Sequence, residues 1–116
     1  TAHKQWYFGK SLDGFTPIGP CIVTADAFAD YPPRLGIRSF VNGEKRQDSN
    51  TALQIFDIDH VIAELSQGMT LKAGTIIATG TPAGVGMGMD PPQFLKPGDV
   101  VRCEIDGIGT LTNPVE

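Results

Sequence analysis

The sequence predicts a mainly β fold with one short helix, and three features of the chain support this prediction. Glycine and proline are frequent, with 14 and 9 among 116 residues, which favours short strands and tight turns over long helices. Two dipeptides, Asn42-Gly43 and Asp106-Gly107, are typical of β-hairpin turns. A single segment, after Asp57, carries apolar residues at helical spacing.

The expected elements follow one another as short extended runs separated by turn residues. Residues 1–20 are rich in turn formers, so we expect them to be mostly irregular. Residues 25–30 have room for one helical turn before Pro32 and Pro33. The expected strands are 21–24, 35–41, 44–48, 75–79, 100–105 and 108–113.

The expected helix begins after Asp57, whose side chain is a good N-cap, and ends near Gly68. Its apolar residues recur every three or four positions, at Ile58, Val61, Ile62 and Leu65. His60 lies within this helix, and a lone helical histidine is usually a surface residue.

Composition excludes several classes of protein. The net charge is −4 and no basic run occurs, so we expect no nucleic-acid partner. No apolar stretch approaches 18 residues, so we expect no membrane span. Cys21 and Cys103 are far apart in sequence and lie in expected strands, which predicts buried free thiols and a reducing compartment. The length is enough for one domain with a modest core.

The stretch 76–88 is the strongest candidate for a binding site. An apolar run that predicts a buried strand leads directly into a loop with four glycines, at positions 80, 84, 86 and 88. Such a backbone can adopt positive φ and approach another molecule closely. Thr79 and Thr81 add hydroxyl groups. A small anionic ligand and a plain turn between strands are about equally compatible with this pattern.

Two familiar glycine loops do not fit this stretch. A phosphate-binding P-loop requires a lysine soon after the first glycine, and the next lysine after Gly80 is Lys96. A dinucleotide-binding loop requires a different glycine spacing and a following helix, which Pro91 and Pro92 prevent.

Two further groups of residues could contribute chemistry. Lys10 lies between two glycine-containing turns and close in sequence to several aromatic residues. It could be a fixed cation, a base whose pKa is lowered by desolvation, or a solvent-facing turn lysine. The polar run 47–51 could bring amide and hydroxyl groups toward a site, although such runs more often satisfy backbone groups in a loop.

Five ordered blocks resemble the fumarylacetoacetate hydrolase family, which includes isomerases, acylpyruvate hydrolases and oxaloacetate decarboxylases. The resemblance runs from about Gln5 to Asn113. The blocks are Gln5-Trp6-x-x-Gly9-Lys10-Ser11, Phe15-x-Pro17-x-Gly19-Pro20, Val41-Asn42-Gly43-Glu44-x-x-Gln47-x-Ser49-Asn50-Thr51, Thr79-Gly80-Thr81-Pro82-x-Gly84-Val85-Gly86 and Phe94-Leu95-Lys96-x-Gly98-Asp99.

The resemblance implies a β-rich roll, or mixed sandwich, and a divalent cation such as Mg²⁺, Mn²⁺ or Ca²⁺. In the family this ion holds a keto or enol acid and stabilises an enolate. At matching positions it implies that Lys10 is catalytic and contacts substrate oxygens. It also implies that Thr81 holds a substrate carboxylate, that Gly80 shapes the same loop, and that Gln5 lines the site.

The family's acidic metal ligands, a Glu-x-Glu pair and two aspartates, have no match in this sequence. We therefore expect residues 1–116 to be a partial catalytic domain, the C-terminal half of the family domain, with the ligands outside it. The upstream metal-ligand segment would be absent, with a gap near residue 2. The alternatives are a non-catalytic truncated domain and a small-ligand binding module.

The predicted function is a metal-dependent hydrolase, lyase or isomerase of small 2-oxo or 2-hydroxydienoic acids, of the kind used in aromatic catabolism. The resemblance further implies a homodimer, and exposed sheet edges would favour such pairing. The expected compartment is the cytoplasm, or the mitochondrion in a eukaryote.

Overall fold

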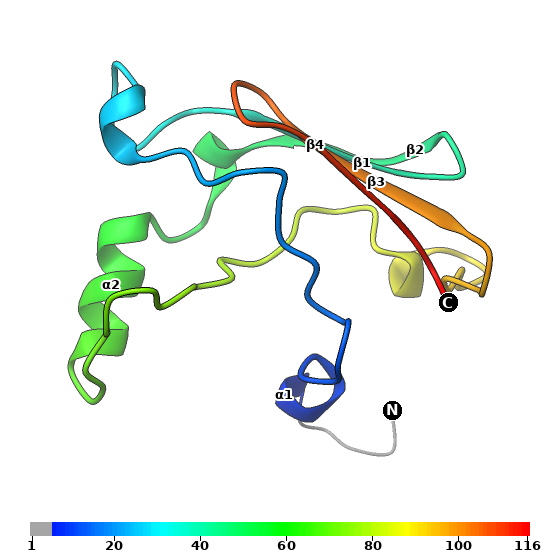
Figure 1. Ribbon diagram of the computed structural model, residues 1–116, viewed down its shortest axis with the longest axis horizontal. Helices are drawn as coiled ribbons and strands as arrows, with labels where there is room; N and C mark the ends of the chain where they lie inside the picture. The colour runs from blue at the N-terminus through cyan, green and yellow to red at the C-terminus, as the bar shows by residue number, and fades with distance from the viewer. Residues whose placement is uncertain (1–5) are drawn as a thin grey trace.

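The computed structural model describes residues 6–116, which form a mainly β fold as the sequence predicts. The described residues contain one four-stranded antiparallel sheet with the order β2-β1-β3-β4. β1 (Gly36–Val41) and β2 (Glu44–Asn50) form one hairpin, and β3 (Val100–Ile105) and β4 (Gly109–Pro114) form the other. Pairing of β1 with β3 joins the two hairpins into a single layer (Figure 1).

Both predicted hairpin turns are present. Asn42 and Gly43 have φ angles of 52° and 83°, as a type I′ turn requires. Asn42 also ties this turn to the start of β3, because its side chain donates to Asp99 at 2.8 Å and accepts from the Val100 N–H at 2.9 Å. At the second turn, the Ile108 N–H donates to the Ile105 carbonyl at 3.1 Å and Gly107 has a φ of 75°.

The predicted helix is α2 (Ile58–Ser66), and its N-cap is confirmed because the Asp57 carboxylate accepts from the His60 N–H at 2.7 Å. The helical turn expected at 25–30 is a 3₁₀ turn, η1 (Ala25–Ala27). Two further 3₁₀ turns are η2 (Thr51–Leu53) and η3 (Gly86–Gly88). A short helix, α1 (Trp6–Gly9), lies in the stretch expected to be irregular.

Two of the predicted strands are wrong. Residues 21–24 and 75–79 run without regular structure, and Ile76 is 68% exposed although a buried strand was expected. Apolar, β-branched residues favour extended backbone, but a strand also needs a neighbour with which to exchange hydrogen bonds. In the described part of the chain the ladder pairs only the other four segments.

The two cysteines differ from their prediction in burial. Both are free thiols, as expected, but both are exposed. Cys21 lies in an irregular segment, where its thiol donates to the Ile108 carbonyl at 3.6 Å. Cys103 lies on β3 opposite Ser39 and Leu111, and its side chain stays exposed.

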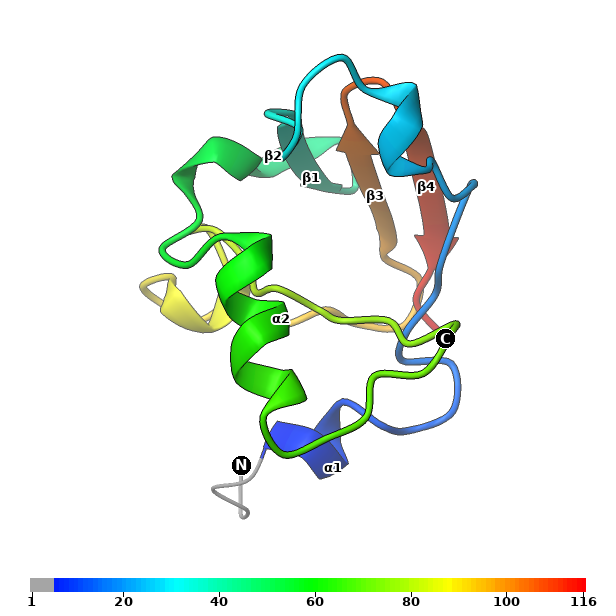
Figure 2. The ribbon, with the colours of Figure 1, turned by 90° about the vertical axis from the view of Figure 1, so that its left-hand side faces the viewer.

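The modest core expected from the length is missing from the described residues. No hydrophobic side chain among them is buried, and α2 stands beside the sheet rather than packing on it (Figure 2). The accessible surface is 9418 Å², whereas a compact monomer of 12.4 kDa exposes roughly 6100 Å². The radius of gyration is 15.6 Å against about 13 Å for a compact chain of this length.

The excess surface, roughly 3300 Å², is comparable to what a large permanent interface buries. Many of the exposed side chains are large and apolar, including Ile22 at 85% and Ile55 at 93% exposure. This arrangement leaves a sheet face and its connecting segments without an apolar layer against them. Among residues 6–116 no helix is long and apolar enough to span a bilayer.

Candidate functional site

The glycine-rich loop after residue 79 is fixed to the middle of β2 by one side chain. The Gln47 amide nitrogen donates to the Thr81 hydroxyl at 2.8 Å and to the Pro82 carbonyl at 2.9 Å. On its other side, the Gln47 amide oxygen accepts from the Ser39 hydroxyl at 2.8 Å. Gln47 and Ser39 are cross-strand partners on β2 and β1, so the sheet itself positions the loop.

Close backbone approach explains two of the loop glycines. A Cβ atom at Gly84 would lie 2.0 Å from the Arg46 carbonyl oxygen, and one at Gly86 would lie 1.8 Å from the Gln93 carbonyl oxygen. Gly84 also has a φ of 104°, which L residues rarely adopt. The prediction of positive φ is therefore confirmed at this position. At Gly84 and Gly86 this close approach is made to the chain's own backbone. The predicted approach of the loop to another molecule stays a prediction.

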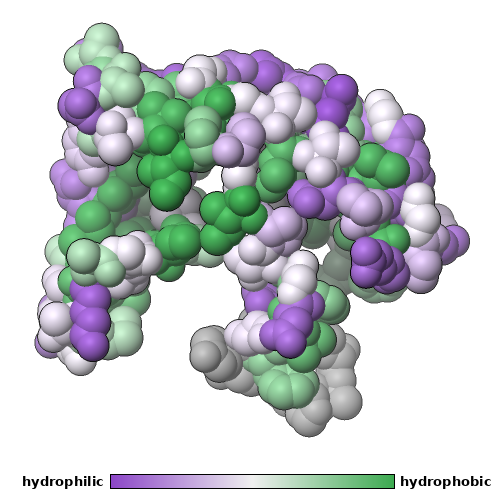
Figure 3. All heavy atoms as spheres, viewed as in Figure 1, coloured by the Kyte–Doolittle hydropathy of each residue, from purple (hydrophilic) through white to green (hydrophobic). Residues whose placement is uncertain are grey.

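A groove of about 720 Å³ lies between this loop, the end of β2 and α2. One wall is formed by the loop residues Thr79, Gly80 and Thr81. Apolar side chains gather around this hollow in Figure 3. They come from the sheet, from the segment after β2 and from α2, and they are Ile37, Leu53, Ile55, Phe56, Val61 and Ile105.

The polar run at the end of β2 mainly satisfies backbone groups around the groove. The Thr51 hydroxyl donates to the Pro33 carbonyl at 2.7 Å and accepts from the Leu35 N–H at 2.9 Å. The Asn50 side chain accepts from the Ala52 N–H at 2.9 Å. Of the two readings of residues 47–51, backbone satisfaction therefore describes Asn50 and Thr51, and Gln47 brings an amide to the groove wall.

The structure brings together some of the predicted site residues and leaves others apart. Gly80 and Thr81 share one wall of the groove. Lys10 is exposed in the turn after α1, and it is not among the residues that line this groove. In both ribbon views α1 lies at the opposite end of the molecule from the sheet (Figures 1 and 2). Gln5 lies outside the described residues, so its predicted role stays a prediction.

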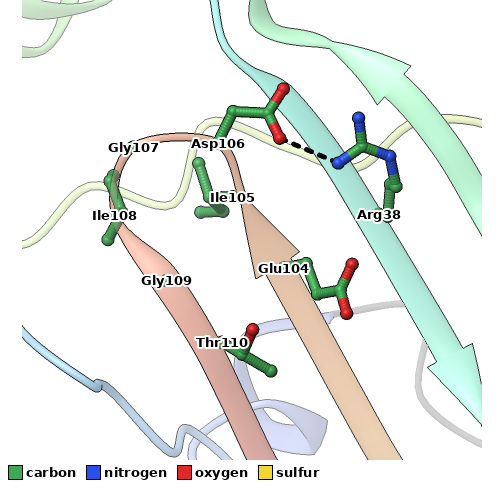
Figure 4. A pocket seen from close by; sticks show the side chains of 8 residues that line it. All are labelled: Arg38, Glu104, Ile105, Asp106, Gly107, Ile108, Gly109 and Thr110. Carbon is green, nitrogen blue, oxygen red and sulfur yellow. Dashed lines mark hydrogen bonds and ion pairs between the residues drawn. The ribbon is translucent and has the colours of Figure 1, made fainter.

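A second, open depression of about 550 Å³ lies at the turn between β3 and β4 (Figure 4). Its cation, Arg38, is paired with Asp106 at 2.8 Å and with Asp48 at 3.6 Å. The hydrogen bond from Arg38 lowers the pKa of Asp106 below its usual value. Because this arginine is already neutralised by two carboxylates, the depression is a poor site for an anionic ligand.

The described residues do not fit a divalent cation by themselves. In the range 6–116 no three side chains of the His, Cys, Asp or Glu type gather around one point. A hard cation such as Mg²⁺ needs several oxygen ligands, usually including carboxylates. The described residues alone therefore do not supply a site for such an ion.

The sequence named Gln47 only as the first member of the polar run 47–51 and did not connect it with the Thr81 loop. Within the block Glu44-Lys45-Arg46-Gln47-Asp48 it looks like one more polar residue of an exposed return strand. The available signal was its place in a polar run next to a hairpin. Its partner loop lies 34 residues further along the chain, and no spacing rule connects the two.

Known proteins are similar to this chain over nearly its whole length. Residues 1–116 match the family model described as "Fumarylacetoacetate (FAA) hydrolase C-terminal". The chain is 52% identical over 112 residues to the mitochondrial oxaloacetate tautomerase fahd2 of Xenopus laevis, an alignment that covers 97% of the chain and 35% of the relative.

Two solved structures are also similar. A fumarylacetoacetate hydrolase from the psychrophile Exiguobacterium antarcticum is 54% identical, with a TM-score of 0.90 over 97% of this chain and 40% of that one. Maleylpyruvate hydrolase from Sphingobium sp. SYK-6, in complex with manganese(II) and pyruvate, is 44% identical, with a TM-score of 0.81 over 93% of this chain and 38% of that one.

The chain therefore belongs to the fumarylacetoacetate hydrolase family, and its fold is the mainly β fold of that family. It spans little more than a third of the length of these relatives, between 35% and 40%. Enzymes named as hydrolases and as a tautomerase share this stretch.

Proposed function

We propose that this chain forms part of the active site of an enzyme that acts on small 2-oxo or 2-hydroxydienoic acids. Family membership supports the class of enzyme. The observation that carries the proposal is the groove wall at Gly80 and Thr81, where a hydroxyl held by Gln47 lies beside a hollow whose lining is mixed and more apolar than polar. Such a wall suits a small acid with one carboxylate and an apolar remainder.

In this proposal the Thr81 hydroxyl donates a hydrogen bond to the substrate carboxylate. Gly80, which has no side chain, leaves space beside the loop for the substrate. A Cβ atom at Gly80 would meet no atom within 4 Å, so the space in front of the loop is available to a ligand. A hydrogen bond to a charged acceptor contributes about 1.5–3 kcal/mol, more than one between neutral groups. The loop therefore contributes both affinity and orientation.

Lys10 is the proposed catalytic residue. Its ammonium group would contact the substrate oxygens and stabilise the negative charge that develops on them when an enolate forms. In the complete enzyme this requires the turn after α1 to face the same substrate as the Thr81 loop. Gln5 is proposed to line the site near Lys10.

A divalent cation in the complete enzyme is a further part of the proposal. The related maleylpyruvate hydrolase structure contains manganese(II) together with pyruvate. Such an ion supplies Lewis-acid stabilisation of an enolate oxygen. Its ligands would come from outside the described residues, because these contain no suitable cluster.

The proposed assembly is a homodimer, supported by the two outer strands β2 and β4, each of which has one edge that no other described strand pairs with. The proposed compartment is the cytoplasm, with the mitochondrion as the alternative, since one relative is a mitochondrial enzyme.

The test is an assay of the complete protein with oxaloacetate and acylpyruvates, with and without Mg²⁺ or Mn²⁺. The proposal predicts saturable turnover of at least one of these acids that is lost on chelation. A protein that neither binds nor converts any of them would be the non-catalytic alternative.

A further inference from the structure

The side-chain amide of Gln47 makes three hydrogen bonds, and together they fix which way the amide points. The Pro82 carbonyl can only accept a hydrogen bond, so the group facing it at 2.9 Å must be the amide nitrogen. The amide oxygen then faces the Ser39 hydroxyl at 2.8 Å, which can donate to it. Turning the amide over would set its oxygen against the Pro82 carbonyl oxygen.

This orientation determines how the Thr81 hydroxyl is used. The amide nitrogen has no lone pair to offer, so in the 2.8 Å contact Gln47 donates and Thr81 accepts. The hydroxyl proton of Thr81 takes no part in that bond. In the described part of the chain the Thr81 side chain has no second hydrogen-bond partner, and Thr81 is exposed on the groove wall.

We propose that Gln47 is a positioning residue that occupies one acceptor lone pair of the Thr81 hydroxyl and leaves its proton available to a ligand in the groove. The site then favours a ligand group with a strong acceptor oxygen, a carboxylate above all, because a charged acceptor gains most from that proton. This inference rests on the proposed function for the identity of the ligand. It goes further because it makes Gln47, which does not touch the ligand, responsible for the direction of the hydrogen bond from Thr81 to the ligand.

The order of donation runs in one direction, from Ser39 to Gln47, from Gln47 to Thr81, and from Thr81 to the ligand. Gln47 accepts from Ser39 and donates to Thr81, and Thr81 accepts from Gln47 and would donate to the ligand, so each bond strengthens the next. This series of hydrogen bonds begins at Ser39 on β1 and continues to Gln47 on β2, so the sheet fixes its first two members. The loop therefore needs no rearrangement to receive a carboxylate.

A double-mutant cycle in the full-length protein tests this inference, with KM and kcat measured for oxaloacetate. We expect Gln47→Leu and Thr81→Val each to raise KM about tenfold with a smaller change in kcat, the size of one charge-assisted hydrogen bond. The double variant should be no worse than Thr81→Val alone, because Gln47 acts through the Thr81 proton. Multiplicative losses of about a hundredfold would overturn the inference.

A near-isosteric variant guards against simple misfolding. In Gln47→Glu the introduced carboxylate accepts from Thr81 and so takes the proton that the ligand needs. KM should then be raised at neutral pH and should fall toward the wild-type value as the introduced acid becomes protonated. Because the introduced charge also repels the substrate carboxylate, the variant is compared with Gln47→Glu/Thr81→Val, in which only the repulsion remains. The pH dependence of KM should be larger in the single variant, and an equal pH dependence in both would contradict the inference.

The matched control is Gln67→Leu, at the C-cap of α2, where the amide contacts only Glu64 among the described residues. It should leave KM and kcat unchanged. If the wild type binds pyruvate in a calorimetric titration but does not turn over oxaloacetate, the proposed function fails. The role of Gln47 is then decided by the same double-mutant cycle with Kd for pyruvate in place of KM. Normal turnover with independent effects of the two substitutions would contradict the role of Gln47 alone, and a protein that binds neither acid would overturn both the proposed function and the role of Gln47.

Discussion

The two regions predicted to act on one substrate, the Thr81 loop and the Lys10 turn, are held in different ways. The loop is tied to the sheet by side-chain hydrogen bonds that join residues 34 and 35 positions apart. Near Lys10, two hydrogen bonds join close neighbours in sequence: the Ser11 N–H donates to the Phe8 carbonyl, and the Thr16 hydroxyl donates to the Lys10 carbonyl at 3.5 Å. The sheet therefore fixes the first region, whereas these two bonds fix the local shape of the second.

This difference indicates how the active site is divided. A wall built on β2 can keep its geometry regardless of what covers the rest of the groove. The turn after α1 lies far from the sheet, so its position toward the substrate depends on further contacts. The exposed apolar surface of this chain offers ample area for such contacts.

The largest effect is expected at the Lys10 turn. Lys10→Met should lower kcat of the complete protein by two orders of magnitude or more, since removal of one preorganised stabilising group costs about 10²–10³ in rate. Thermal unfolding should be unchanged. Lys72→Met, at another exposed turn, serves as the control and should retain full activity. Near-normal turnover of Lys10→Met would remove this residue from the mechanism.

The contact between loop and sheet is tested by stability rather than activity. Gly84→Ala should lower the melting temperature markedly, because its Cβ atom would meet the Arg46 carbonyl and its φ is 104°. Gly74→Ala is the matched control, with a φ of 84° and no atom within 4 Å of its Cβ position. The control isolates the cost of positive φ, about 1–2 kcal/mol. Equal melting temperatures for the two variants would mean that the loop is not pressed against β2.

The binding role of the loop is tested at Thr81. Thr81→Ser keeps the hydroxyl and should leave KM within about twofold, whereas Thr81→Val should raise KM about tenfold, the loss of one hydrogen bond to a charged group. The comparison of kcat with KM matters here, since the loop is proposed to bind and Lys10 to act on the reacting oxygens. An unchanged KM in Thr81→Val would leave the groove without its proposed carboxylate contact.

The smallest effect concerns Asp99, which lies just before β3 and accepts a hydrogen bond from Asn42 in the turn between β1 and β2. Hydrogen bonds from the Asn42 side chain and then from the Lys96 N–H lower the pKa of Asp99 in the folded protein. A carboxylate with a lowered folded pKa stabilises the fold above its unfolded pKa, near 4, and this contribution is lost as pH falls through the folded pKa. Asp99→Asn should therefore flatten the fall in urea midpoint between about pH 5 and 3. A curve with the wild-type slope would exclude this linkage.

Local signals in the sequence were sufficient for most of the sheet and for the helix. The Asn42-Gly43 dipeptide, the alternation at 100–105 and the cap at Asp57 each depend on a few neighbouring residues, and each is confirmed. Residues 75–79 have the composition of a strand but remain unpaired, because they do not lie alongside an edge strand of the sheet. Local sequence does not determine which segments lie side by side. The missing core has the same origin, since burial depends on what lies against the apolar side chains.

The candidate site shows the same limit. The glycine loop with Thr81 could be singled out as a candidate because its residue types and spacing are distinctive, and its role in binding stays a prediction. Gln47 could not be assigned its role, since a glutamine on an exposed return strand has no local feature that points to a loop 34 residues away. Gly84 was predicted to permit positive φ, but its crowding against Arg46 emerges only from the tertiary contact.

The most direct test of the proposed site is a crystal structure of the complete protein with pyruvate bound. We expect one carboxylate oxygen of pyruvate to lie at hydrogen-bond distance, about 2.7–3.0 Å, from the Thr81 hydroxyl oxygen. In that complex the Gln47 amide nitrogen should still donate to the Thr81 hydroxyl oxygen. Pyruvate bound away from the Thr81 loop, or a Thr81 hydroxyl turned out of the groove in that complex, would contradict the proposed site.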